Sequence, residues 1–281
     1  KGVPYTPRNP TFESTCADNT MIGNPPRGAT NISQAGIPLN YDNVDSCLQV
    51  GGRLIIDTDF TLNGGDVLLE PNTENVVSAN QTLTITNANL QSCENYMWQG
   101  ITLGDGANLV LEGNTISDAI QAVKTRNHPT IEIIDNTFDR NYIALDILDI
   151  PIIEAVSGNT FSCSDTLNSG LWGLYGARVT NGLLFMGDFN PTVTEQNTFK
   201  DLEYGVVSSF SIVSIADAVC ENLRYDTTPP PVGSSNSIGV FAEAQSQITL
   251  TDCTFKNLNK GCVANNSSLD FYDNTIDTVN Y

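Results

Sequence analysis

One short segment of this chain holds a cluster of basic side chains, and it is therefore the first place to look for chemistry. Lys124, Arg126 and His128 lie in VKTRNHP, and Arg140 follows in the next repeat of the sequence. A base beside cationic groups is what a polysaccharide lyase needs to abstract a proton next to a uronate. A polyanionic substrate, however, is drawn to a positive groove, and this chain has a net charge of −20. We therefore favour a solvated turn for this segment.

Carboxylates offer the next chemistry, as calcium ligands or as the acid and base of a hydrolase. Asp57 and Asp59 in IDTDF, and Asp105 in GDGAN, place oxygen atoms at expected turns, which is where calcium is bound. None of these runs matches a known calcium loop, so we predict no cofactor, leave calcium binding open and assign no metal ligand. The sequence has no GHG and no NTD-plus-DD pair of the kind that glycoside hydrolysis would use. We therefore assign no catalytic residue.

Cysteine usage indicates an oxidising compartment. The seven cysteines are widely spaced and include no CxxC pair, which excludes zinc-ribbon and thioredoxin motifs. Cys16 and Cys47 bracket a proline-rich segment, and a bridge between them would contribute about 3–4 kcal/mol in the loop-entropy model. We predict this disulfide and an extracellular or bacterial cell-surface location. The odd count leaves at least one thiol unpaired or paired outside the chain, and several cysteines can equally be small buried apolar residues.

Composition excludes several classes of partner. Of the 281 residues, 16% are charged, against about 25% in an ordinary soluble domain. Binding to nucleic acid or to anionic lipid needs clustered Lys and Arg, and no apolar run is long enough to span a bilayer. We therefore expect no nucleic-acid partner and no membrane insertion.

The chain repeats itself with a period of about 20 to 23 residues, and this repeat decides the fold. It is visible in LVLEGNTISDAIQAV from Leu109, IEIIDNTFDRNYIAL from Ile131 and LDFYDNTIDTVNY from Leu269. The apolar residue that follows Asn-Thr serves as an anchor in each copy. The anchors are Leu90, Ile116, Phe138, Phe161, Phe199, Val219, Phe255 and Ile276, and an asparagine column lies two residues earlier at Asn114, Asn136, Asn159, Asn197 and Asn274.

Each copy predicts three short strands separated by three turns. Alternating apolar residues such as Leu109 and Leu111 predict a strand with one buried face, the anchor lies on the second strand, and a small residue such as Ala122 or Gly205 precedes the third. The column asparagine tolerates left-handed dihedrals at the turn between the first two strands. Stacked about 4.8 Å apart, such coils place Asn on Asn and Phe on Phe, and no coil can bury its face alone. We predict an all-β, three-sheet parallel β-helix, which the crossover rule makes right-handed; a β-sandwich would not keep one register over eight copies.

The repeat resembles that of the right-handed parallel β-helix proteins of the pectate-lyase-like superfamily, over about residues 50–281. The segments GGRLIIDTDF, TLTITNANLQSC and MWQGITLGDGANLVLEGNTISDAIQAV, between Gly51 and Ala122, are similar to repeat regions of large bacterial surface proteins exported by type IX secretion. The resemblance implies the architecture. The superfamily includes lyases, hydrolases and epimerases, but the chain carries no catalytic motif that could be transferred.

Proline content and repeat spacing predict how the chain is organised. Residues 1–48 are rich in proline and lack the repeat, so we predict a cap that covers the first coil. Residues 49–281 form the solenoid, with insertions at about 164–191, which contains Trp172, Tyr175, Phe185 and Phe189, and at about 224–237, which contains TTPPPVG. The third strand after Ile276 would begin at 282, so we expect an incomplete last coil. The expected completion is a longer parent protein or another chain.

These observations predict a secreted or cell-surface structural and adhesive solenoid, assembling end to end or forming part of a longer surface protein. Its predicted partners are copies of itself or further repeats of the same protein, and a polysaccharide. The alternatives are a lyase-like carbohydrate-active enzyme and a carbohydrate-binding module that uses the loop aromatics. A cleft with convergent charges would favour the enzyme, and a flat face with aromatic rings in a row would favour binding.

Overall fold

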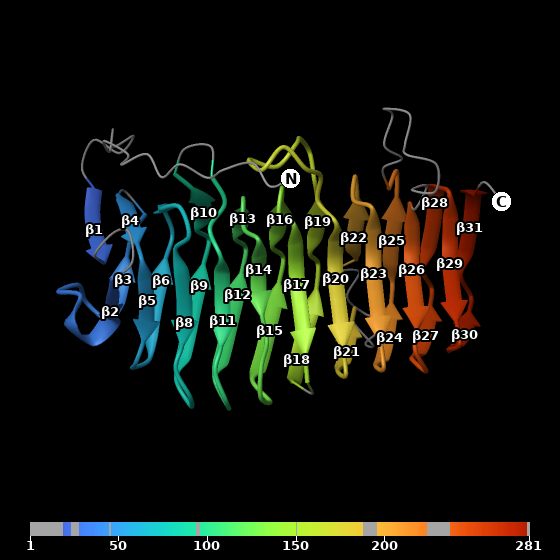
Figure 1. Cartoon of the computed structure of the whole chain (residues 1–281), viewed down its shortest axis with the longest axis horizontal. Coiled ribbons are helices and arrows are strands. Elements are labelled where there is room, and N and C mark those ends of the chain that lie inside the picture. Colours follow the sequence, from blue (N-terminus) through green and yellow to red (C-terminus); the bar gives the residue numbers. More distant parts are fainter. Residues whose placement is uncertain are drawn as a thin grey trace, which may run out of the picture.

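The computed structural model shows strands that wind round one long axis, three to each coil (Figure 1). It describes residues 19–23, 28–44, 46–93, 96–149, 151–187, 196–223 and 237–279. Strands from successive coils lie side by side and form continuous sheets along the axis. The predicted all-β parallel solenoid is therefore confirmed.

Three sides of the solenoid are formed by parallel sheets. Sheet A contains β1 (Asn19–Gly23), β4 (Cys47–Gly51), β7 (Asp66–Leu69), β10 (Asn89–Ser92), β13 (Thr115–Ser117), β16 (Thr137–Asp139), β19 (Thr160–Ser162), β22 (Asn197–Lys200), β25 (Ala218–Glu221), β28 (Thr254–Leu258) and β31 (Thr275–Val279). Sheet B contains β2 (Ala29–Asn31), β5 (Arg53–Ile56), β8 (Glu74–Val77), β11 (Gly100–Leu103), β14 (Gln121–Lys124), β17 (Ile143–Leu148), β20 (Tyr175–Thr180), β23 (Tyr204–Ser209), β26 (Ile238–Glu243) and β29 (Lys260–Asn265).

The third side is divided into two sheets. Sheet C contains β3 (Asn40–Asp42), β6 (Phe60–Asn63), β9 (Thr82–Thr86), β12 (Asn108–Glu112), β15 (Thr130–Ile134) and β18 (Ile152–Ser157), and sheet D contains β21 (Leu183–Met186), β24 (Ile212–Ala216), β27 (Gln247–Thr251) and β30 (Ser268–Tyr272). At the junction of the two sheets, the Gly187 N–H donates to the Val156 carbonyl at 2.8 Å. The register also shifts on β18, where Ile131 faces Ile153 but Glu132 faces Ala155.

The interior explains why the alternating pattern folds in this way. The inward residues of successive coils, such as Leu109 and Leu111 on β12 and Ile131 and Ile133 on β15, are at most 1% exposed and face one another in register. Each such side chain contributes about 1.5–3 kcal/mol when it is removed from water. The polar residues between them point outward, so one face of every sheet is apolar and the other is free for function.

The N-terminal segment is not a separate cap from Asn19 onward. β1 pairs with β4 in parallel register, from Asn19 opposite Cys47 to Gly23 opposite Gly51, so residues assigned to the cap form the first coil. The short 3₁₀ helix η1 (Ile32–Gln34) and Pro38 occupy the turn before β3, which is where a solenoid accepts proline. The predicted cap residues 1–18 lie outside the described residues.

The first predicted insertion is shorter than the sequence suggested. β20 and β21 lie inside the range 164–191, yet β20 pairs in register with β17 and β23. The extra residues before β20 are 163–174, which connect sheet A to sheet B at one long edge of the solenoid (Figure 1). Of the second predicted insertion, only Ser237 is among the described residues. No helix in the described part of the chain has the length and apolar composition needed to cross a bilayer.

Candidate functional site

Four of the predicted column asparagines form a buried hydrogen-bonded ladder. The Oδ1 atoms of Asn136, Asn159 and Asn197 accept the backbone N–H of the column asparagine one coil earlier, at 2.9, 2.9 and 3.1 Å. Each Nδ2 donates to a carbonyl of the preceding coil, as Asn114 does to Ile85 at 2.8 Å. All four side chains are at most 2% exposed, so the ladder satisfies polar groups that would otherwise be buried without partners.

The ladder is interrupted and then resumes near the C-terminal end. Ala218 pairs with Asn197 in the next coil. Cys253 follows, and its Sγ lies 3.4 Å from the Thr251 carbonyl, in the place of an asparagine amide. Asn274 accepts the Cys253 N–H at 2.7 Å. The left-handed residue at this turn is the one before the column: Gly113, Asp135 and Asp273 have φ of 66°, 55° and 52°. The column asparagine was expected to take that conformation and does not, because its side chain must point inward.

The predicted phenylalanine anchors stack inside the solenoid. The Phe138, Phe161 and Phe199 rings are nearly parallel, with centroids 5.2 and 4.8 Å apart. Ile116 precedes this stack in register, and Phe255 and Ile276 occupy the same column near the end. Glycines of sheet B face these interior rings: a Cβ on Gly176 would collide with the Phe199 ring, and one on Gly239 would approach the Phe255 ring to 2.7 Å.

One predicted anchor is wrong by one residue. Cys220 faces Phe199 and Phe255 in register and is 3% exposed, whereas Val219 pairs with Thr198 on the outer side. This copy of the repeat reads IADAV and lacks the Asn-Thr pair that marks the register elsewhere. The asparagine and anchor columns are thus architectural, and they fix which residues face outward on each sheet.

The basic segment found in the sequence does not converge on one point. Lys124 Nζ donates to Gln121 Oε1 at 3.0 Å, while Arg126 and His128 are exposed in a turn where His128 has a φ of 59°. Arg140 instead makes a bidentate ion pair with the buried Asp118, at 3.1 and 3.0 Å. The hydrogen bonds that Arg140 donates to Asp118 raise the pKa of Arg140, so this side chain stays charged and paired with Asp118.

The candidate calcium ligands are likewise used within turns. Asp57 accepts the Ser33 N–H at 3.1 Å and the Ser33 hydroxyl at 2.6 Å, and Asp59 accepts the Thr82 N–H at 2.8 Å. Asp105 lies in the turn before β12, and its backbone carbonyl accepts the Asn80 N–H at 3.2 Å. Within the described ranges, no three His, Cys, Asp or Glu side chains gather as a metal site.

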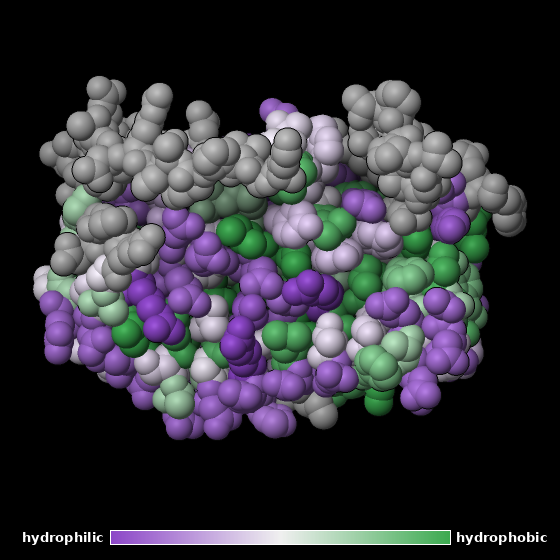
Figure 2. Space-filling view, viewed as in Figure 1, coloured by the Kyte–Doolittle hydropathy of each residue, from purple (hydrophilic) through white to green (hydrophobic). Residues whose placement is uncertain are grey.

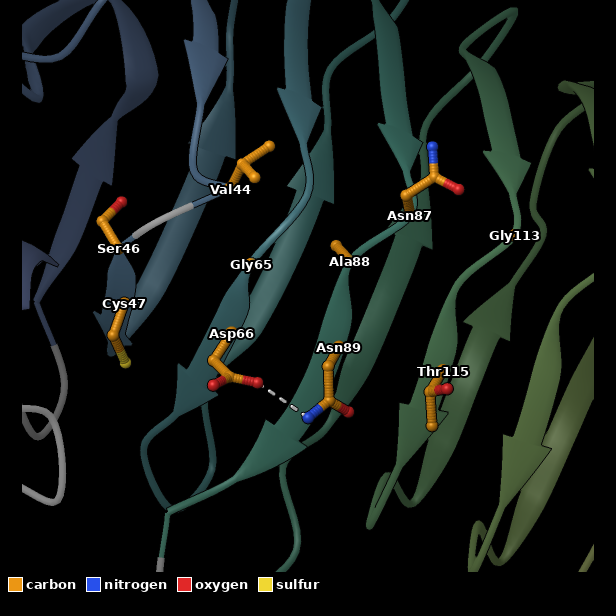
Figure 3. Close-up of a pocket in the computed structure, with 10 residues that line it drawn as sticks. All are labelled: Val44, Ser46, Cys47, Gly65, Asp66, Asn87, Ala88, Asn89, Gly113 and Thr115. Carbon is orange, nitrogen blue, oxygen red and sulfur yellow. Dashed lines mark hydrogen bonds between the residues drawn. The ribbon is translucent and has the colours of Figure 1, made fainter.

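A polar hollow of about 600 Å³ opens beside the first strands of sheet A (Figure 3). Gly65, Ala88 and Gly113 leave space at the turns, and Asp66 and Asn89 line the hollow, with Asn89 Nδ2 donating to Asp66 Oδ1 at 2.9 Å. Asp66 is the carboxylate among its lining residues. Two carboxylates are needed for glycoside hydrolysis, so this hollow is not built for that reaction.

The outer face of sheet B carries a second arrangement, which the sequence analysis missed. Asp146 on β17 is fully buried and accepts from Arg178 Nε and Nη2, both at 2.8 Å, and from Gln121 Nε2 at 2.6 Å. The bond to Asp146 raises the pKa of Arg178. Lys124, Asp146 and Arg178 share one column of the sheet. The 22-residue offset between Lys124 and Asp146 could have revealed it, but the loop before β20 breaks the period before Arg178.

Aromatic rings continue from this ion pair along three neighbouring strands. Arg178 lies over the Tyr175 ring, 5.9 Å from its centroid. The Tyr175 and Tyr204 centroids are 5.4 Å apart and those of Tyr204 and Phe241 are 6.1 Å apart. All three rings are partly exposed. We call the surface formed by Gln121, Asp146, Tyr175, Arg178, Tyr204 and Phe241 the sheet B strip.

The surface around the sheet B strip changes character along the axis. In Figure 2, apolar side chains gather over β23, β26 and β29, and hydrophilic side chains dominate over β5 to β14. The strip lies where the two regions meet. Of the aromatic residues expected in the first insertion, Tyr175 belongs to the strip, Trp172 is half-buried against the core, Phe185 lies on β21 of sheet D, and Phe189 lies outside the described residues.

The cysteines divide into a bonded one and interior thiols. Cys47 is disulfide-bonded, and Cys16 lies outside the described residues, so their pairing stays a prediction. Cys220, Cys253 and Cys262 are free thiols in the last coils. Burial raises the pKa of Cys253 to about 11 and that of Cys262 to about 12, so neither is a nucleophile at neutral pH.

Comparison with known proteins identifies the family of this chain. No curated protein matches the sequence. A solved structure, the crystal structure of PfbA, a surface adhesin of Streptococcus pneumoniae, is similar with a TM-score of 0.40 and 10% identity, covering 93% of this chain and 84% of that chain. The family model described as the right-handed β-helix region matches residues 74–276, which is most of the chain and includes the asparagine ladder and the phenylalanine stack. The chain therefore belongs to the right-handed β-helix family.

Proposed function

We propose that this protein is a secreted or cell-surface structural module that adheres through a face of its solenoid. The observation that carries the proposal is the sheet B strip, where a buried carboxylate is neutralised by Arg178 and accepts a further hydrogen bond from Gln121, and aromatic rings follow one another on adjacent coils. A rigid face with its charges already paired suits binding, because little side-chain entropy is lost when a partner docks.

The geometry argues against the lyase-like alternative. A general base must be able to take up a proton, but Asp146 already accepts three hydrogen bonds. Arg140 and Arg178 are each paired with a buried carboxylate, Asp118 and Asp146. Incubation with pectate and alginate is therefore expected to give no unsaturated product absorbing in the ultraviolet. Product formation that Lys124→Ala or Arg126→Ala abolishes would overturn the proposal.

The direct test of adhesion is retention of the folded protein on polysaccharides and on bacterial cell walls. The protein should bind and be recovered intact, and the polymer should not be shortened. A protein that is retained by no surface, with or without calcium, would refute the adhesive role.

We also propose that the coil formed by β29, β30 and β31 associates with further coils, from the same protein or from a copy. Ile276 is 58% exposed and Phe271 is 38% exposed, although the same columns are buried one coil earlier, at Phe255 and Leu250. Unpaired strand edges recruit other strands. Sedimentation should show self-association that Ile276→Lys weakens. The control Phe210→Lys should not weaken it, because Phe210 is exposed in the turn between β23 and β24, away from this end of the solenoid.

A further inference from the structure

The sheet B strip has the features of a site for an extended and uncharged ligand. We propose that it binds a neutral polysaccharide chain lying along the solenoid axis; this inference rests on the proposed adhesive function and names its ligand and its contact residues. Tyr175, Tyr204 and Phe241 come from three successive coils. A ligand that touches all three must therefore be a chain that runs along the axis.

The rings supply the apolar part of the contact. Tyr175 and Tyr204 are tilted by 49° and Tyr204 and Phe241 by 58°, so the row presents ring faces and edges rather than one closed stack. Sugar rings have an apolar face of C–H groups, and aromatic side chains contribute large contact areas to it at low conformational cost. Parallel strands hold the three rings in fixed register, so the row is already organised before a ligand arrives.

The polar groups of the strip supply orientation without net charge. Arg178 and Asp146 neutralise each other through two bonds of 2.8 Å, and the remaining N–H groups of Arg178 can donate to hydroxyl oxygens. These groups favour a ligand that carries hydroxyl groups and no ionised ones.

The charge of the whole protein decides between neutral and acidic polysaccharides. The net charge is −20, and a polyanion approaching any face meets that field. The cation that lies over the first ring, Arg178, is paired with Asp146 and therefore offers no compensating positive charge to a polyanion. Polyuronates should therefore bind more weakly than neutral glycans.

The test is affinity electrophoresis in native gels containing one polymer each. The probes are soluble neutral β-glucan, mannan and xylan, and the polyuronates pectate and alginate. The variants are Tyr175→Ala and Phe241→Ala, with Phe210→Ala as the matched control because Phe210 is 59% exposed and lies in the turn between β23 and β24. Thermal melting of each variant checks that the fold is kept.

At least one neutral polymer should retard the wild type, and each strip variant should lose about tenfold in affinity while Phe210→Ala does not. Retardation that survives both strip substitutions would overturn the strip and leave adhesion standing. Stronger retardation by pectate or alginate than by the neutral polymers would overturn the ligand class. If no polymer and no cell wall retains the protein, the proposed function fails together with the inference. Should Tyr175→Ala not fold, Phe241→Ser decides the same question.

Discussion

Replacing Asn136 by leucine removes the centre of the asparagine ladder with little change in volume. Asn136 is 1% exposed and bonds to both neighbouring coils. Its Oδ1 accepts the Asn114 N–H at 2.9 Å, and its Nδ2 donates to the Leu111 carbonyl at 2.9 Å and to Asn159 Oδ1 at 3.1 Å. The substitution leaves the Asn114 N–H without its acceptor and the Leu111 carbonyl without this donor.

The expected loss follows from those two groups. Each buried polar group left without its partner costs about 1–3 kcal/mol, and burying the leucine offsets part of this, which gives a net loss of about 1–3 kcal/mol. A chain of this size loses about 2 °C in melting temperature for each kcal/mol. The variant should therefore melt about 2–6 °C lower than the wild type.

Thermal unfolding followed by far-ultraviolet circular dichroism gives the melting temperature, and hydrogen exchange shows whether β13, β16 and β19 lose protection first. The matched control is Asn108→Leu, because Asn108 is half-buried on the outer face and makes one bond of 3.4 Å to Thr82. That change should cost less than about 0.5 kcal/mol. Equal melting temperatures for the two variants and the wild type would refute the reasoning that the ladder stabilises the coils.

Three further outcomes are expected. The raised pKa of Cys253 and of Cys262 means that the folded state holds these protons to higher pH than the unfolded state does, so the contribution of the two thiols to stability should be constant below about pH 9 and be lost towards pH 11. Urea unfolding at several pH values between 8 and about 11 checks this, and a flat profile over that interval contradicts it. Burial raises the pKa of Asp139, but hydrogen bonds from Ser164 and Ser162 lower it overall, so the wild type should lose the stability that this carboxylate contributes as pH falls below about 4. Asp139→Asn should abolish that pH-dependent loss. Acid unfolding measures it, and an acid midpoint that is the same in the variant and the wild type would contradict the prediction. Arg178→Met leaves Asp146 charged in a buried site and should lower the free energy of unfolding by about 3–5 kcal/mol. The double variant Arg178→Met with Asp146→Leu should regain most of that free energy. Chemical unfolding measures both, and additive losses would show that the two side chains are not coupled.

The coil architecture could be predicted because its determinants repeat. The Asn-Thr-apolar triplet recurs where the chain must turn, bury an amide and fill the interior, so Asn114, Asn136 and Phe138 mark the register by sequence alone. The prediction was wrong where one copy lacks the triplet, at Ile215–Cys220. There the anchor was assigned to Val219, one residue before Cys220, which occupies that position in the structure. Strands β20 and β21 were assigned to an insertion because the loop before them disturbed the spacing.

The sheet B strip could not be predicted from the sequence in the same way. Its members lie on outward positions, where the interior imposes no residue type, and Arg178 and Phe241 each follow a stretch that breaks the period. The pairing of Arg178 with Asp146 depends on which coils become neighbours. Contacts across the sheet thus become visible only when the register of every coil is known.

The division of the third side between β18 and β21 has a mechanical consequence. Elsewhere in the described coils, each coil is hydrogen-bonded to its neighbour along all three sides, so tension along the axis is shared among three sets of backbone hydrogen bonds. At this junction the ladder on the third side is replaced by the Gly187 to Val156 bond, and the neighbouring sheets carry more of the load. A rod pulled from its two ends should therefore yield first at this coil, separating into two stiff segments before either one unravels.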